Sequence, residues 1–182
     1  MKIGVPKEVH AGEQRVALTP ETAGRIHKLG FEICVEAAAG AAAQFSDESY
    51  REAGVEVVAD TKALWAGSDI VMKVLEPEMH PDLGVDEAEL VRDGGTLISF
   101  IWPAQNSDML EKLKARNATV IAMDSVPRIS RAQKLDARSS MATTLQTRLA
   151  DAAAPRALAL LLLPPPSLVP KTPTLTARPP LM

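Results

Sequence analysis

The sequence predicts a doubly wound α/β domain, in which helices cover both faces of a mostly parallel β-sheet. Short runs rich in β-branched residues alternate with helix-like segments between residues 2 and 123, and this alternation is typical of βαβ units. The runs are apolar at nearly every position, as expected for strands that helices cover on both faces. The chain has 182 residues, which is in the range of one domain, or of one domain and a fragment.

Six strands and five helices are expected in alternation. The strands are expected at KIGV, FEICVEA, VEVVA, DIVMKV, TLISFI and TVIAM, which occupy residues 2–5, 31–37, 55–59, 69–74, 96–101 and 119–123. The helices are expected at residues 20–29, 46–54, 60–67, 86–91 and 107–117. In the last helix, Met109, Leu110 and Leu113 form an apolar stripe, which predicts a surface helix that covers the sheet. The predicted fold is flavodoxin-like or Rossmann-like.

The ends of two helices carry their own signals. Thr19 precedes Pro20, an arrangement typical of an N-cap followed by proline at the first helical position. Gly30 follows the last apolar residue of the same helix, where a C-terminal glycine is common. Ser46 and Gly54 bracket the next helix in the same way. These residues support both helices independently of the apolar pattern.

The charge balance and the apolar runs exclude two classes of partner. The chain has 20 basic and 23 acidic residues and a net charge of -3, whereas nucleic-acid binding needs a clustered basic face. The longest apolar run, residues 157–163, is too short to cross a bilayer and is followed by prolines. The N-terminus lacks the long apolar segment of a signal peptide. We therefore expect no nucleic-acid binding, no membrane span and a cytoplasmic location.

The cysteine and the histidines predict structural roles. Cys34 lies in the apolar run FEICVEA and is expected to be a buried structural thiol. His10, His27 and His80 do not have the spacing of metal ligands. We expect each histidine to be structural or solvated, and we expect no metal.

The composition changes near residue 143. Eight of the 14 prolines fall between Pro155 and Pro180, Asp151 is the last acid, and no glycine follows Gly95. A proline-rich tract without turn glycines or an amphipathic period cannot bury enough apolar surface to offset the entropy lost on ordering. We therefore expect an α/β domain at residues 1–142 and a disordered tail at residues 143–182.

The polar segment PRISRAQKLDARSS, residues 127–140, is the strongest candidate for a binding site. It follows the last expected strand, and ligands of open α/β sheets bind outside the carboxyl ends of the strands. On a helix, an amide, a carboxylate and two hydroxyls would share one face and could hydrogen-bond a ribose and a carboxamide. This face consists of Gln133, Asp136, Ser139 and Ser140. Arg128 and Arg131 add donors suited to phosphate. A solvated helix face with ordinary charge pairs is the alternative.

Two cations are candidates for a ligand pocket. Arg15 comes just after the loop that follows the first strand, and Lys73 lies near the end of DIVMKV. A cation in or beside an apolar strand must be paired or must serve a ligand. A structural ion pair with Glu8, Glu13 or Glu76 is the alternative.

The chain contains no G-x-G-x-x-G motif. Such a loop lets backbone N–H groups approach the pyrophosphate of a dinucleotide at a helix N-terminus. The glycine pair Gly94–Gly95 precedes a strand and indicates a turn. If the protein handles a dinucleotide, we expect it to supply only part of the site.

Five stretches of the chain are more specific together than singly: KIGVPKEVHAGEQRVALTPET, FSDESYREAGVEVVAD, DIVMKV, TLISFIWPAQN and MDSVPRISRAQKLDARSSMA. They resemble the N-terminal part of the alpha subunit of bacterial proton-translocating NAD(P) transhydrogenase, over residues 1–142. Alanine dehydrogenase is a relative in which Arg15 and Lys73 would correspond to the groups that hold the substrate carboxylate. Its catalytic histidine is expected after TLISFI, where this chain has Trp102. The resemblance therefore favours transhydrogenase.

This resemblance implies that the alpha subunit binds NAD(H) and passes a hydride to NADP(H) held by the beta subunit, coupled to proton translocation. It implies that Arg128, Gln133, Asp136 and Ser139 meet the nicotinamide and its ribose. Gln133 would reach toward the partner's nucleotide, so Gln133 and Asp136 are the expected catalytic residues. It further implies a homodimer of the full-length alpha subunit and a peripheral position at the inner membrane through the partner subunits.

The family pattern stops near Ala142. The resemblance implies a continuation as Asn-Ile-Ala-Gly-Tyr-Arg and then a Rossmann domain with Gly-Ala-Gly-Val-Ala-Gly, whereas this chain reads TTLQTRLADAAAP. A one-base slip would make Thr-Leu-Gln from codons for Asn-Ile-Ala-Gly, so we expect a frameshifted or truncated product that is inactive alone. Arg138 also stands where an apolar residue is expected. The alternatives are an alanine dehydrogenase-like oxidoreductase and a non-catalytic fragment.

Overall fold

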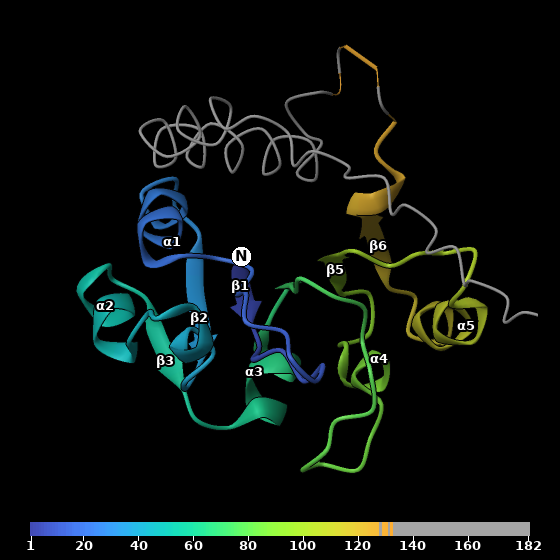
Figure 1. Ribbon diagram of the computed structural model, residues 1–182, viewed down its shortest axis with the longest axis horizontal. Helices are drawn as coiled ribbons and strands as arrows, with labels where there is room; N and C mark the ends of the chain where they lie inside the picture. The colour runs from blue at the N-terminus through green and yellow to red at the C-terminus, as the bar shows by residue number, and fades with distance from the viewer. Residues whose placement is uncertain (128, 131, 133–182) are drawn as a thin grey trace, which may run out of the picture. The chain divides into compact units, whose positions relative to one another are not determined.

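The computed structural model describes residues 1–127, 129, 130 and 132, and these residues contain one parallel sheet of six strands (Figure 1). The strand order is β3-β2-β1-β4-β5-β6, and every neighbouring pair is parallel. The strands are β1 (Lys2–Val5), β2 (Glu32–Glu36), β3 (Glu56–Val58), β4 (Ile70–Met72), β5 (Thr96–Ser99) and β6 (Thr119–Ala122). The predicted α/β fold is confirmed, and each strand lies within the run that predicted it. Residues of the expected tail lie outside the described part of the chain.

In the described residues, five α-helices and one 3₁₀ helix lie between the strands, and a second 3₁₀ helix follows β6. The α-helices are α1 (Pro20–His27), α2 (Asp47–Glu52), α3 (Thr61–Gly67), α4 (Glu87–Leu90) and α5 (Ser107–Ala115), and the 3₁₀ helices are η1 (Ala41–Ala43) and η2 (Met123–Ser125). The expected caps are present. The Thr19 hydroxyl accepts a hydrogen bond from the Thr22 N–H at 3.3 Å, and the Ser46 hydroxyl accepts one from the Ser49 N–H at 3.2 Å.

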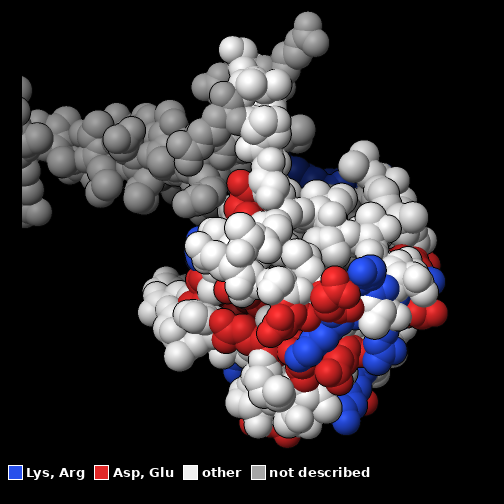
Figure 2. Space-filling view, turned by 90° about the vertical axis from the view of Figure 1, so that its right-hand side faces the viewer, with Lys and Arg blue, Asp and Glu red and all other residues white. Residues whose placement is uncertain are grey.

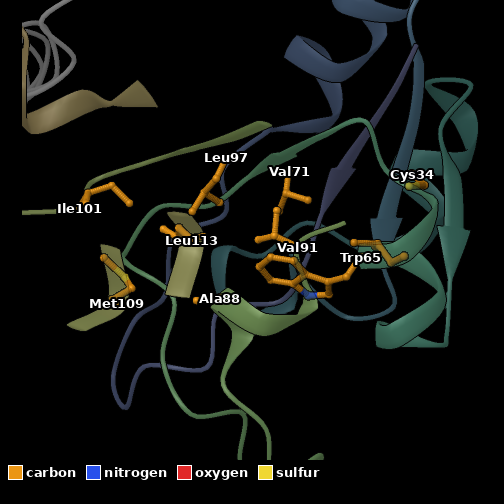
Figure 3. Packing of buried hydrophobic residues seen from close by; sticks show 10 residues of the cluster. Cys34, Trp65, Val71, Ala88, Val91, Leu97, Ile101, Met109 and Leu113 are labelled. Atoms are coloured by element: carbon orange, nitrogen blue, oxygen red, sulfur yellow. The ribbon is translucent and has the colours of Figure 1, made fainter. Parts of the chain in front are cut away.

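Two apolar clusters lie on opposite faces of the sheet. Successive side chains of a strand point to opposite faces, and in β2 Ile33 and Val35 belong to one cluster whereas Cys34 belongs to the other. The first cluster packs under α1 and α2, where the Tyr50 hydroxyl donates to the Leu18 carbonyl at 2.8 Å. The second packs under α3, α4 and α5 around the buried Trp65 (Figure 3). Helices therefore cover both faces, as predicted.

The face under α3 is tightly packed where this helix ends. A Cβ added to Gly4 of β1 would lie 2.1 Å from the Ser68 hydroxyl oxygen, so only glycine allows this approach. Cys34 packs beside the same serine, with its sulfur 3.7 Å from that oxygen. The thiol is fully buried, and burial raises its pKa. Cys34 is thus a buried thiol, as the sequence predicted.

One half of the α1 and α2 face is less covered than the other. The register aligns Met72, Ile98 and Ile121 in one row across β4, β5 and β6. Met72 and Ile98 are half-buried, and Ile121 is 46% exposed. In Figure 1, α1 and α2 lie over the β1–β3 side of the sheet, away from this row. The row is therefore an apolar surface at the β6 side of the sheet.

The charges on the face shown in Figure 2 are mixed in sign, with acidic and basic side chains side by side in one band. Ion pairs of the protein surface include Lys112 with Asp86 at 2.6 Å and Arg92 with Asp69 at 2.5 Å. In the described part of the chain, no helix is both long enough and apolar enough to span a membrane.

Candidate site at the carboxyl edge of the sheet

The strand order places a topological switch point between β1 and β4. The chain runs outward from β1 to β2 and β3 on one side, and from β4 to β5 and β6 on the other. In open α/β sheets the connections diverge at such a point, and ligands bind in the crevice outside the carboxyl ends of the strands. The residues after β1 and after β4 therefore form the expected site. They include Glu8 and Lys73.

Lys73 follows β4 directly and is fully buried between two acids. It forms an ion pair with Glu87, from the first turn of α4, and its Nζ lies 3.7 Å from Glu8 Oε2. The side chains of both acids are also buried. The sequence proposed Glu8, Glu13 or Glu76 as ion-pair partners for the two cations, and Glu8 lies beside Lys73. Glu87 was missed, because the segment DEAELV gives no sign that its first glutamate turns toward the sheet.

The two acids also hold the loop that follows β4. Glu8 Oε1 accepts a hydrogen bond from the Val74 N–H at 2.6 Å, and Oε2 accepts a longer one from the Leu75 N–H at 3.4 Å. Glu87 Oε2 accepts from the Glu78 N–H at 3.1 Å. Burial raises the pKa of both carboxyls, and the Lys73 ammonium partly opposes that rise. This cluster ties the loop after β1 to the loop after β4.

Arg15 lies on the same edge and has a carboxylate partner of its own. Its Nε donates to Glu13 Oε1 at 2.8 Å, and its Nη2 donates to Glu13 Oε2 at 2.5 Å. This bidentate ion pair lowers the pKa of Glu13 to about 2, and the hydrogen bonds from Arg15 are the main cause. The pair lines a cavity of about 250 Å³ together with Lys7, Glu8 and the alanines at positions 38, 39, 41 and 42. Arg15 and Lys73 are thus linked through Glu8, which contacts Lys73 and lines the Arg15 cavity.

Trp102 lies beyond the carboxyl end of β5 in an unusual backbone conformation. Its φ angle is 44°, in the left-handed region that bulky residues rarely occupy. The carboxylate of Asp124, in η2, accepts hydrogen bonds from the Ile101 N–H at 2.7 Å and the Trp102 N–H at 3.1 Å. The indole stacks on Phe100 with the ring centroids 6.1 Å apart. Asp124 therefore joins the loop after β5 to the end of β6.

Each of the three histidines has a hydrogen-bond partner within the described residues. His80 Nδ1 accepts hydrogen bonds from the Asp82 and Leu83 N–H groups, both at 3.3 Å, and so closes a turn. His10 Nδ1 lies 2.6 Å from Glu78 Oε1, and His27 Nδ1 lies 3.1 Å from the Phe31 carbonyl. Among the described residues, no group of three or more histidines, cysteines or acids could hold a metal ion.

The predicted nicotinamide-side residues Arg128, Gln133, Asp136 and Ser139 lie outside the described residues, as does Arg138. The last described element before them is η2, which directly follows β6 at the carboxyl edge. The loop between β1 and α1 contains a single glycine, Gly12. The described residues therefore offer cations, acids and an aromatic pair at this edge, but not a glycine-rich cradle for a pyrophosphate.

Comparison with known proteins relates the chain to one family. The family described as "Alanine dehydrogenase/PNT, N-terminal domain" matches residues 4–145. The NAD(P) transhydrogenase subunit alpha of Cereibacter sphaeroides is 56% identical over 142 residues, which are 78% of this chain and 26% of that protein. The chain therefore spans about a quarter of the length of that relative.

Two solved structures share the fold. The crystal structure of transhydrogenase from Sinorhizobium meliloti matches with a TM-score of 0.67 and 31% identity, over 75% of this chain and 39% of that one. A structure of L-alanine dehydrogenase matches with a TM-score of 0.63 and 33% identity, over 69% of this chain and 33% of that one. The sequence identity to both structures is high enough to indicate a relationship beyond a shared fold.

Proposed function

Since the chain belongs to the alanine dehydrogenase/PNT N-terminal domain family, we propose that it acts as the N-terminal part of the NAD(H)-binding alpha subunit of a proton-translocating NAD(P) transhydrogenase. The observation that carries this proposal is Trp102, held beyond the end of β5 by Asp124. The family resemblance places the catalytic histidine of alanine dehydrogenase at this position. An indole cannot exchange a proton as an imidazole does. Hydride transfer between two nicotinamides needs no such proton exchange.

The residues proposed to hold the nicotinamide and its ribose are Arg128, Gln133, Asp136 and Ser139. The amide and carboxylate would orient the carboxamide and ribose, and the guanidinium would neutralise a phosphate. Gln133 would reach toward the second nucleotide. When bound, NAD(H) supplies the hydride itself, and the protein's part is to bind and orient the ring. Support for these roles is the family pattern and their position in the sequence, shortly after β6.

The second nucleotide, NADP(H), is proposed to lie on the beta subunit, so that turnover needs both subunits. In this proposal the alpha subunit is peripheral to the inner membrane, is attached through its partners and forms a homodimer in its full-length form. The chain matches only a quarter of the relative from Cereibacter sphaeroides. No glycine follows Gly95 in these 182 residues, so we propose that they supply only part of the NAD(H) site and do not catalyse transfer alone.

An alanine dehydrogenase-like activity is the second candidate, because Arg15 and Lys73 would then hold a substrate carboxylate. The charges argue against it. Lys73 already contacts two carboxylates, and Arg15 is engaged in a two-pronged pair with Glu13. An incoming carboxylate would have to displace one of these partners. A non-catalytic fragment is the third candidate and requires that no nucleotide binds.

Titration of the purified 182-residue chain with NADH tests the proposal. Nucleotide fluorescence reports binding, and circular dichroism reports folding. Saturable binding by a folded chain supports a partial nicotinamide site. A folded chain that binds no NADH would make it a non-catalytic fragment. Alanine-dependent reduction of NAD⁺ would instead revive the alanine dehydrogenase candidate.

A further inference from the structure

We infer that Trp102 and Phe100 form a stacking platform for a planar aromatic ring, namely the nicotinamide of a bound dinucleotide. This inference rests on the proposed function, since that function brings a nicotinamide to the carboxyl edge of the sheet. It adds two residues to the proposed nicotinamide site.

The backbone around Trp102 is held in place by several hydrogen bonds. A left-handed conformation at a bulky residue costs free energy and persists only where its surroundings enforce it, which happens most often at functional sites. Here the Asp124 carboxylate accepts a hydrogen bond from the Trp102 N–H at 3.1 Å. The N–H groups of Gln105 and Asn106 donate to the Trp102 carbonyl at 2.9 Å and 3.3 Å. These bonds fix where the indole emerges from the loop.

The two rings are stacked but not buried. Their planes are inclined by 28°, and both side chains are only half-buried. Phe100 lies two residues beyond Ile98, and alternation along the strand places it on the same face as the apolar row Met72, Ile98 and Ile121. On that face, α1 and α2 lie over the β1–β3 side of the sheet, away from the row (Figure 1). A pair that served only the core would be enclosed, so the half-exposed rings are available to a further ring.

The position suits the nicotinamide end of a dinucleotide. The platform follows β5 at the edge where ligands of open sheets bind, and Asp124 links it to the chain just before Arg128. Indole is the best aromatic partner for a planar cation, and oxidised nicotinamide is such a cation. Reduced nicotinamide is neutral and keeps only the stacking contribution. The platform should therefore favour NAD⁺ more than NADH.

Tryptophan fluorescence can test this contact directly. The chain has two tryptophans, and Trp65 is fully buried in the α3 to α5 cluster. In a Trp65→Phe background, Trp102 is the sole indole emitter of the full chain. We expect saturable quenching of Trp102 on titration with NAD⁺, at the same midpoint that calorimetry gives for binding.

Variants at position 102 test the energetic contribution. Trp102→Ala should weaken NAD⁺ binding about five- to 150-fold, the range expected for loss of one stacked ring, and should weaken NADH binding less. Trp102→Phe keeps a ring and should retain most of the affinity, which also covers the case in which the alanine variant fails to fold. Leu29→Ala, which removes a 76% exposed side chain just before β2 at the amino edge, should change neither affinity.

The outcomes separate this inference from the proposed function. If calorimetry shows NAD⁺ binding while Trp102 emission stays constant and the alanine and phenylalanine variants bind equally well, the platform is wrong and the proposed function stands. If neither nucleotide binds to a folded chain, both are overturned. Quenching together with a selective loss of NAD⁺ affinity supports the platform.

Discussion

Replacing Lys73 with methionine should destabilise the protein strongly, because it leaves two buried acids without a cation. Methionine keeps most of the length of the lysine side chain but carries no charge. Lys73 is fully buried, pairs with Glu87, and lies 3.7 Å from Glu8. At an effective dielectric constant of about 20, unit charges at this separation attract by about 4.5 kcal/mol. Removing one partner of a buried pair costs about 3–5 kcal/mol, and we expect a loss of that size near neutral pH.

The loss should depend on pH in a direction that the two carboxyls determine. Burial raises the pKa of Glu8 and of Glu87, and Lys73 opposes the rise. Without Lys73 both pKa values should rise further, so the folded protein retains protons that the unfolded chain releases. A carboxyl group whose pKa is higher in the folded protein than in the unfolded chain contributes stability that is fully present below the unfolded pKa. This contribution is lost as the pH rises through the folded pKa. The Lys73→Met protein should therefore recover stability as the pH falls.

Urea unfolding, followed by circular dichroism near pH 7 and near pH 5, measures both effects. Lys112→Met is the matched control, since Lys112 pairs with Asp86 at the surface and is 40% exposed, and it should change stability far less. Adding Glu87→Gln to Lys73→Met should restore part of the loss, because one buried negative charge is removed. An equal loss at both pH values, or a loss no larger than that of the control, would refute the reasoning.

Three further predictions concern other parts of the chain. The Arg15–Glu13 pair should stabilise the fold at pH values above 4.5, the ordinary pKa of glutamate, and this stabilisation should be lost as the pH falls toward the folded pKa of about 2. Glu13→Gln should therefore remove the loss of stability over this pH range from an acid-unfolding curve. Identical curves for the variant and the original protein would contradict the prediction. Gly4→Ala should destabilise the fold by about 1–3 kcal/mol through overpacking, because the new Cβ would meet the Ser68 hydroxyl at 2.1 Å; urea unfolding measures this, and an unchanged midpoint would show that α3 yields easily. Asp136→Asn should weaken NADH binding more than folding, since the amide keeps the shape and removes the charge; equal affinity by nucleotide fluorescence would exclude Asp136 from the site.

The fold was predictable because two signals agreed along the chain. Apolar runs fixed the strands, and residues such as Thr19, Ser46 and Gly54 fixed helix ends through backbone hydrogen bonds and left-handed conformation. What the pattern did not give was the exact length of each strand. β4 ends at Met72, whereas the apolar run continues to Val74, because apolar character continues into a loop that other elements cover.

The candidate site was predictable only in part. The sequence singled out Lys73 because a cation after an apolar strand is unusual, and it named Glu8 as one of three partners. Glu87 could not be found, because it belongs to a short helix whose buried side is set by long-range packing against Lys73. The left-handed conformation of Trp102 was also not predictable, since it depends on Asp124, which is 22 residues away in sequence.

Acids, rather than glycines, organise the carboxyl edge of this sheet. Glu8, Glu87 and Asp124 each accept backbone N–H groups of loops that follow β4 or β5. Two of these acids also neutralise Lys73, while Glu13 neutralises Arg15. An anionic substrate therefore gains little from either cation unless it displaces a carboxylate that already has good geometry. A ligand that presents an uncharged or cationic ring to this edge meets no such competition, and the half-exposed Trp102 and Phe100 are the groups best suited to receive it.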